Sequence, residues 1–105
     1  MPTDPRWPRV ADPGSSGPRV AILFCPGCRW QTRASWMALE LFNTFGDALG
    51  EIALVPAGSG VFEIRLNNEC LHSRARDGSF PELKPIKQRI RDRIQPDRDL
   101  GHSEP

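Results

Sequence analysis

The spacing of hydrophobic residues changes after Phe24, and this change marks the boundary between two predicted elements. Val20 to Phe24 is an unbroken run of β-branched, aliphatic and aromatic residues, which is typical of a short buried strand. From Trp30 onward the apolar residues recur every three or four positions, which predicts an amphipathic helix ending at Gly46. The buried face of this helix should consist of Trp30, Ala34, Met37, Ala38, Leu41 and Phe45.

Two further segments extend this pattern toward an α/β fold. Ile52 to Val55 predicts a second strand parallel to the first, so that the intervening helix makes a right-handed crossover. Near the C-terminus, a narrow apolar stripe at helical spacing predicts a last helix that starts at Pro81, or at Pro85 as first helical residue, and ends before Pro96. This stripe contains Leu83, Ile86, Ile90 and Ile94.

Residues 61–74 predict a β-hairpin that turns at Asn67-Asn68. Two asparagines suit a type I′ turn, in which both central residues need positive φ. The register set by this turn places Glu63 opposite His72 on one side of the hairpin. The element order is then β-α-β-β-β-α. It describes a four-stranded mixed sheet with both helices on one face and the other face open to water.

The first 18 residues differ in composition from the rest of the chain. Prolines at positions 2, 5, 8, 13 and 18 interrupt any helix or strand, which predicts a disordered leader. We also considered a leader docked on the domain through Trp7, but favour an unattached one. The predicted organisation is a leader (1–18), one domain (19–95) and a loosely held tail (96–105).

Charge and cysteine content exclude several classes of protein. The net charge of +1, with 26% charged residues of both signs, argues against binding to nucleic acid or anionic membranes. No apolar stretch approaches the roughly 20 residues that span a bilayer, and the N-terminus lacks the layout of a signal peptide. Three cysteines without such a signal favour a reducing cytoplasm, where a Cys-x-x-Cys pair is usually catalytic or metal-binding.

Cys25-Pro26-Gly27-Cys28 stands at the predicted strand-to-helix junction. The N-terminus of a helix favours a thiolate over a thiol, so we expect Cys25 as N-cap and Pro26 as first helical residue. The charges of Arg29 and Arg33 would stabilise a thiolate or hold a carboxylate such as that of glutathione. Two solvated arginines fit the sequence equally well.

The cysteine motif and three later blocks, in this order, resemble the selenoprotein W-like proteins (SelT/SelW/SelH, or Rdx, family), with the bacterial cysteine-containing members closest. These blocks are Gly60-Val-Phe-Glu-Ile64, Leu71-His-Ser-Arg74 and Gly78-Ser-Phe-Pro-Glu82. The resemblance runs from about Arg19 to Ser103. It implies a thioredoxin-like fold and a thiol oxidoreductase role, with Cys28 where selenoproteins of the family carry selenocysteine.

The residues that we expect to carry the chemistry are Cys25 and Cys28. Thioredoxin-like proteins in general attack with the first cysteine of such a pair, whereas this family implies Cys28, and the sequence leaves the order open. Arg29 and Trp30 directly follow the pair, and strand direction places two further loops beside it. The possible substrate-contacting residues are therefore Arg29, Trp30, Gly60, Val61 and Phe80. We expect no cofactor, and as partner a thiol or disulfide substrate, either glutathione or a protein.

Two alternatives belong to other classes. One is a structural zinc site built from Cys25, Cys28, Cys70 and His72, whose ligand types suit zinc. Strand geometry argues against it, because Cys70 should lie beyond the hairpin turn, well over 10 Å from the pair. The other is a non-catalytic module that binds a partner through the open sheet face. On that face we predict an exposed apolar patch formed by Ala21, Leu23, Ala53, Val55 and Val61.

Overall fold

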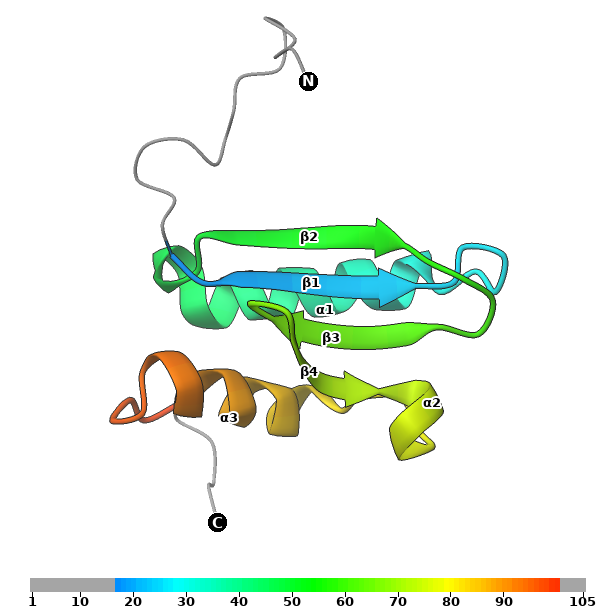
Figure 1. The fold of residues 1–105 in the computed structure, drawn as a ribbon. Coiled ribbons are helices and arrows are strands. Elements are labelled where there is room, and N and C mark those ends of the chain that lie inside the picture. Colours follow the sequence, from blue (N-terminus) through cyan, green and yellow to red (C-terminus); the bar gives the residue numbers. More distant parts are fainter. Residues whose placement is uncertain (1–16, 101–105) are drawn as a thin grey trace, which may run out of the picture.

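A four-stranded mixed sheet forms one layer of the protein and helices form the other (Figure 1). The structure is a computed structural model that describes residues 17–100. In chain order the elements are β1 (Arg19–Phe24), α1 (Gln31–Phe45), a 3₁₀ turn (Gly46–Ala48), β2 (Glu51–Pro56), β3 (Phe62–Leu66), β4 (Glu69–Ser73), α2 (Arg74–Asp77) and α3 (Leu83–Ile94). The predicted leader up to residue 16, its possible contact through Trp7, and the end of the predicted tail from residue 101 lie outside the described residues.

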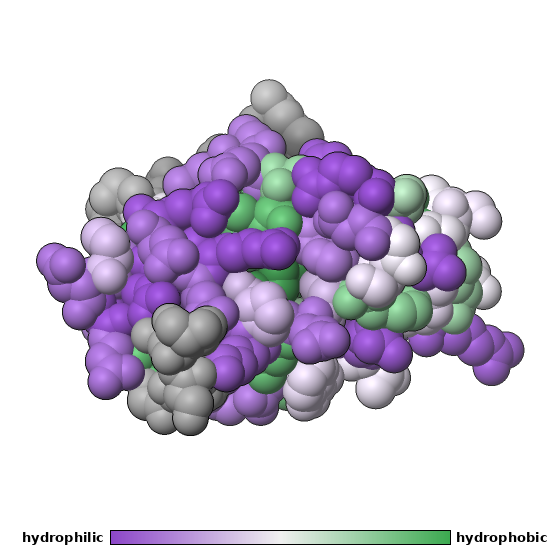
Figure 2. Space-filling view, turned by 90° about the horizontal axis from the view of Figure 1, so that it is seen from below, coloured by the Kyte–Doolittle hydropathy of each residue, from purple (hydrophilic) through white to green (hydrophobic). Residues whose placement is uncertain are grey.

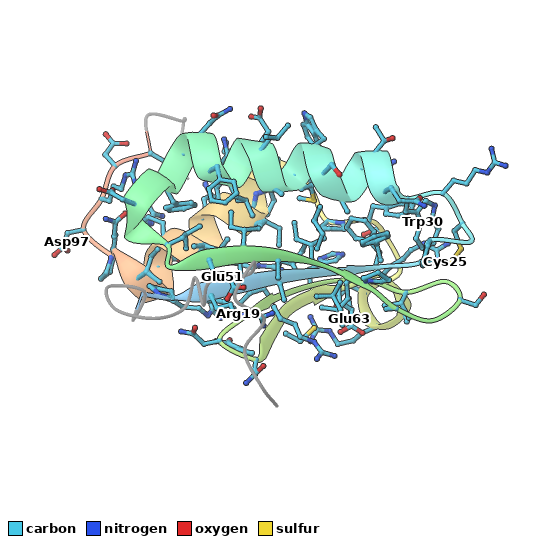
Figure 3. All side chains as sticks on the ribbon, turned by 90° about the horizontal axis from the view of Figure 1, so that it is seen from above. Arg19, Cys25, Trp30, Glu51, Glu63 and Asp97 are labelled. Atoms are coloured by element: carbon cyan, nitrogen blue, oxygen red, sulfur yellow. A yellow bond between two sulfur atoms is a disulfide. The ribbon has the colours of Figure 1, made fainter. Side chains whose placement is uncertain are left out.

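Strand β1 is one of the two inner strands of the sheet, whose order is β2-β1-β3-β4. It runs parallel to β2 and antiparallel to β3, so Phe24 pairs with Pro56 on one side and with Phe62 on the other. The C-terminal end of β1 therefore lies beside the end of β2 and the start of β3. In Figure 3, Cys25 and Trp30 lie at this end of the sheet, and Arg19, ion-paired with Glu51, lies toward the other end.

Helices α1 and α3 cover the same face of the sheet, as predicted (Figure 3). The α1 side chains expected to be buried are indeed in the core, except Trp30, which is partly exposed and precedes the helix. Ile86 and Ile90 of α3 belong to the same core. From below, where α3 lies, the surface is mostly hydrophilic with a narrow hydrophobic strip (Figure 2). Among residues 17–100, no helix has the length and apolar character needed to cross a bilayer.

Helix α3 begins at Leu83, earlier than the start at Pro85 that we considered. Pro85 is its third residue. The first four N–H groups of a helix have no partner within the helix, so a proline in the first turn breaks no hydrogen bond. The first such bond runs from the Ile86 N–H to the Glu82 carbonyl at 3.2 Å.

A β-bulge changes the predicted register of the hairpin. The turn is as expected, with positive φ at both asparagines (50° at Asn67 and 72° at Asn68). Beyond it, a shift between Ile64 and Arg65 pairs Ile64 with His72, so our placement of His72 opposite Glu63 is wrong. A bulge sets two residues of one strand against one of the other. As a result His72 lies on the helix-covered face.

The open face of the sheet carries fewer exposed apolar side chains than we predicted. No helix of the described chain packs on it, as expected, but Ala21 is buried and Leu23 and Val55 are partly buried. Arg65 pairs with Ala21 in the register and is held along this face by Glu63, at 2.9 Å. The largest exposed apolar side chains lie elsewhere, on α1 and on the edge strand β2: Trp36, Leu39, Phe42 and Leu54.

Candidate redox site

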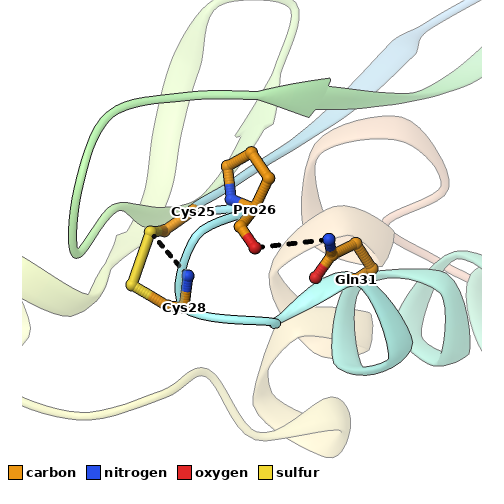
Figure 4. The surroundings of a disulfide bond; sticks show 4 residues. All are labelled: Cys25, Pro26, Cys28 and Gln31. Atoms are coloured by element: carbon orange, nitrogen blue, oxygen red, sulfur yellow. Dashed lines mark hydrogen bonds between the residues drawn. A yellow bond between two sulfur atoms is a disulfide. The ribbon is translucent and has the colours of Figure 1, made fainter.

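Cys25 and Cys28 form a disulfide directly after β1 (Figure 4). Their Cα atoms are 5.3 Å apart, within the range that a disulfide requires. Cys25 follows the last residue of β1, an inner strand that is paired on both sides. The pair therefore lies at one end of the sheet, directly after a strand that two neighbours hold in place.

A compact turn separates the disulfide from α1. The Cys28 N–H donates to Cys25 Sγ at 3.1 Å, and the Arg29 N–H donates to the Pro26 carbonyl at 3.0 Å. The Gln31 side chain donates to the same carbonyl at 3.3 Å (Figure 4). Arg29 takes the left-handed conformation, with φ of 61°, which breaks the helical path between the cysteines and α1.

The expectation that Cys25 caps the helix is therefore wrong. Helix α1 begins at Gln31, its N-cap is Trp30, and no side-chain hydrogen bond caps it. The cysteines lie one turn before the helix, where its dipole acts less strongly than in the first turn. The Cys28 N–H is instead the donor that would stabilise a thiolate on Cys25.

The two sulfur-bearing residues differ in exposure. Cys25 is 3% exposed, whereas Cys28 is partly exposed. An incoming disulfide must reach the attacking sulfur in line with its own S–S bond, so a thiol at the surface is the accessible nucleophile. Cys28 is therefore accessible to solvent, whereas Cys25 is buried.

Three aromatic side chains pack together beside the pair, and we call Trp30, Phe62 and Phe80 the aromatic wall. The rings meet edge to face, with centroid separations of 4.9 Å for Trp30–Phe80, 5.4 Å for Phe62–Phe80 and 6.2 Å for Trp30–Phe62. Phe62 is fully buried, and the other two are partly exposed. The wall joins the disulfide turn to β3 and to the segment after α2.

Two guanidinium groups lie over the aromatic wall. Arg33 from α1 stacks on Phe80, 4.0 Å from the ring centroid. Arg74 from α2 lies 5.1 Å from the Trp30 ring and 5.3 Å from the Phe80 ring. Sequence reasoning included Arg33 but missed Arg74. The block Leu71-His-Ser-Arg74 could have indicated Arg74, because the hairpin ends beside the cysteines and its last residue therefore lies close to them.

The other predicted contact residues, Arg29, Gly60 and Val61, are not part of the aromatic wall. Arg29 is exposed beside Cys28. Gly60 has φ of 74°, and the loop before β3 is joined to β1 by a hydrogen bond from the Ala57 N–H to the Phe24 carbonyl at 2.7 Å. Val61 is partly buried at the end of that loop. The loop thus lies next to the strand residue that precedes Cys25.

Helix α2 holds the segment that carries Phe80. Ser73 is its N-cap, and the Asp77 carboxylate accepts hydrogen bonds from the Ser73 N–H at 3.0 Å and from the Arg76 guanidinium at 2.9 Å. The hydrogen bond from Arg76, followed by that from Ser73, holds the pKa of Asp77 well below its usual range. Gly78 then turns the chain with φ of 81°.

The four residues of the zinc alternative are not brought together. Cys25 and Cys28 bond to each other, and Cys70 is a free thiol opposite Arg65 on β3. Arg65 in turn pairs with Ala21, in the first half of β1, so Cys70 lies away from the end of the sheet that carries the pair. Within the described part of the chain, no three His, Cys, Asp or Glu side chains cluster as a metal site would require.

Comparisons with known proteins agree with this geometry. The model of the Rdx family matches residues 19–92. A crystal structure of a protein from Bordetella parapertussis is 54% identical, with a TM-score of 0.72, and the match covers 74% of this chain and 99% of that one. A selenoprotein W-related protein from Vibrio cholerae is 38% identical, with a TM-score of 0.73, and the match covers 76% and 100%. No curated protein sequence matches significantly. The chain belongs to the Rdx family of selenoprotein W-related proteins.

Proposed function

We propose that this protein is a thiol–disulfide oxidoreductase of a reducing cytoplasm, in which Cys28 attacks the substrate and Cys25 resolves the intermediate. The observation that carries the proposal is the bonded pair itself, with one sulfur-bearing residue partly exposed and the other almost fully buried. The order agrees with the family resemblance, which puts selenocysteine at the position of Cys28.

The reaction begins from the reduced pair. The Cys28 thiolate attacks one sulfur of a substrate disulfide, forming a mixed disulfide and releasing the other half of the substrate as a thiolate. The Cys25 thiolate then attacks the Cys28 sulfur, which closes the Cys25–Cys28 bond and releases the second substrate thiolate. Two electrons pass from the pair to the substrate, and two equivalents of an external thiol restore the reduced pair.

Glutathione is the substrate class that we favour. Its two carboxylates would meet Arg33 and Arg74, whose guanidinium groups stand over the aromatic wall, and Arg29 lies exposed beside Cys28. A guanidinium binds a carboxylate through paired hydrogen bonds, and a flat aromatic support keeps it oriented. The pair would then exchange electrons with glutathione or with a glutathionylated protein.

The proposal is tested by trapping the mixed disulfide. In a Cys70→Ala background, Cys25→Ser cannot resolve the intermediate, so incubation with oxidised glutathione should leave one glutathionyl group on Cys28 by intact mass. The matched Cys28→Ser variant should react far more slowly, because Cys25 is buried. Faster trapping on Cys25 would reverse the proposed order, and no trapping on either cysteine would refute the proposed glutathione chemistry.

A further inference from the structure

The large apolar side chains that are exposed within residues 17–100 gather in one region of the surface. They are between 42% and 62% exposed, and they are Trp36, Leu39 and Phe42 on α1 and Leu54 on β2. Residues three apart on a helix are neighbours on its surface, so the three side chains of α1 form one continuous row. We call it the α1 row. Single exposed apolar residues are common on proteins, whereas adjacent ones indicate a contact surface.

The α1 row borders the open edge of the sheet. On the other flank of α1, Arg33 stacks on Phe80 and Glu40 faces Lys87 of α3, so the row lies on the flank away from α3. Leu54 pairs in register with the buried Ile22, so it points to the helix-covered face, where α1 contacts β2. Strand β2 is an edge strand of the sheet, so Leu54 extends the row toward solvent.

The described part of the chain starts at this same edge. Gly17 packs against Gly50 so closely that a Cβ atom at Gly50 would lie 2.6 Å from the Gly17 carbonyl oxygen. The Gly50 N–H also donates to the Pro18 carbonyl at 2.7 Å. Gly50 lies between the end of α1 and the start of β2 (Figure 1). Residues 1–16 are therefore attached where α1 and β2 meet.

The sequence of residues 1–16 suits a surface with exposed aromatic rings. Pro2, Pro5 and Pro8 recur every three residues, which is one turn of a polyproline II helix, so in that conformation they share one edge. Such proline edges bind surfaces lined by aromatic side chains. Trp7, on the neighbouring edge, adds a large apolar group. One turn is about 9 Å long, which matches the distance of about 9 Å along α1 from Trp36 to Phe42.

We propose that residues 2–8 dock on the α1 row of the same molecule, with the proline edge on Trp36 and Phe42 and with Trp7 against Leu39. Pro8 lies nine residues before Gly17, and at about 3.1 Å per residue this segment spans about 28 Å, more than the length of α1, about 22 Å. Every part of the row is therefore within reach. The proposal does not depend on the redox function.

Two physical terms favour this occupant. Proline restricts the chain before it docks, which lowers the entropy lost on docking. Covalent attachment gives an effective concentration in the millimolar range, which a second copy of the chain lacks. Residues 101–105 contain no large apolar side chain that could compete. Composition alone favoured an unattached leader because prolines interrupt helices and strands, but polyproline II is neither.

Nuclear magnetic resonance of the full chain tests the contact directly. The Trp7 ring should show nuclear Overhauser contacts to the Leu39 methyl groups, and its indole signal should differ from that of an isolated peptide of residues 1–16. In Leu39→Glu, which places a charge at a 62% exposed position, the Trp7 signal should move to the peptide position. Ala75→Glu makes a similar change at an exposed position of α2 and should leave the Trp7 signal unchanged. A Trp7 signal at the peptide position in the unmodified chain would overturn the proposal.

Limited proteolysis gives a second readout. Trypsin cleaves after Arg6 and Arg9, which flank Trp7 and Pro8. Cleavage follows the undocked fraction, so both bonds should be cut about three- to tenfold more slowly in the unmodified chain than in Leu39→Glu. Ala75→Glu should behave like the unmodified chain. Equal rates in all three proteins would contradict docking.

Trp7→Ala covers the case in which Leu39→Glu does not fold, because Trp7 lies outside the described domain. It should shift the signals of Trp36 and Leu39 and leave that of Cys70 in place, whereas unchanged signals along the α1 row would refute the contact. Sedimentation separates the proposal from pairing with a second copy. The full chain should be a monomer at every concentration tested, and a dimer that Leu39→Glu abolishes would assign the α1 row to a second copy and overturn the proposal.

Discussion

Trp30 and Phe80 meet edge to face with ring centroids 4.9 Å apart, although they belong to segments far apart in the chain. Trp30 is the N-cap of α1, two residues after the disulfide, and Phe80 lies in the loop between α2 and α3. This contact fixes the second half of the fold against the cysteine turn. Three of the predictions below depend on residues that form or flank it.

Truncating Phe80 should destabilise the protein. Phe80→Ala removes a partly buried ring that touches two other aromatic rings, which should lower the free energy of unfolding by about 2–3 kcal/mol. Phe42→Ala is the matched control, because its ring is 46% exposed on α1. We expect that control to cost about 1 kcal/mol or less. Equal costs in urea titrations would show that the wall contributes no special packing.

Neutralising the arginines at the wall should impair reaction with anionic substrates only. Arg33→Met and Arg74→Met keep much of the stacked side chain and remove the charge, so the rate with oxidised glutathione should fall by about two- to fivefold for each. The rate with the uncharged hydroxyethyl disulfide should stay the same. Arg93→Met, which loses a surface ion pair with Glu69, is the control. Equal losses with both substrates would refute a carboxylate-binding role.

Glycine should be tolerated at position 29 and not at position 33. Arg29 has φ of 61°, a conformation that costs a side-chain-bearing residue about 1 kcal/mol or more relative to glycine. Arg29→Gly should therefore leave the melting temperature unchanged or raise it. Arg33→Gly makes the same chemical change inside α1 and should cost about 1–2 kcal/mol, from helix propensity and from lost stacking on Phe80. A larger loss at position 29 would contradict the described turn.

Asp77 should contribute stability that is lost in acid. Its hydrogen bonds from Arg76 and Ser73 lower its pKa in the folded state, so the folded protein holds this proton less tightly than the unfolded chain. The stability that Asp77 contributes is then fully present above the pKa that this carboxyl group has in the unfolded chain. It declines as the pH falls below about 4. The stability difference between the unmodified protein and Asp77→Ala should be constant from pH 7 to pH 5 and shrink below pH 4. A stability difference between the two proteins that grows in acid would contradict this prediction.

The hydrophobic pattern predicts the element order and the shared face of the two helices, because the spacing of apolar residues differs clearly between strand and helix. It also predicts the hairpin turn, since two successive asparagines tolerate the positive φ that the turn needs. The bulge in β4 has no comparable signal. Leu71 and His72 are both buried, and a strict two-residue alternation would have placed only one of them inside.

The redox pair was identifiable from its motif, but its immediate surroundings were not. Nothing in Cys-Pro-Gly-Cys-Arg-Trp indicates that Arg29 adopts a left-handed conformation and delays the helix to Gln31. The sequence did not predict Arg74 at the site, because its closeness to Trp30 depends on tertiary structure. Local spacing therefore predicts the reactive atoms, and the packing of distant segments decides which charges accompany them.

The central claim is that Cys25 and Cys28 form a reversible redox pair without Cys70. Intact and peptide mass spectrometry before and after mild peroxide treatment tests it directly, in the unmodified protein and in Cys70→Ala. Both proteins should lose two hydrogens within the peptide that contains Cys25 and Cys28, and a reducing thiol should restore them. A crosslink from Cys70 to either cysteine, or stable adducts on one cysteine in place of the internal disulfide, would contradict the account.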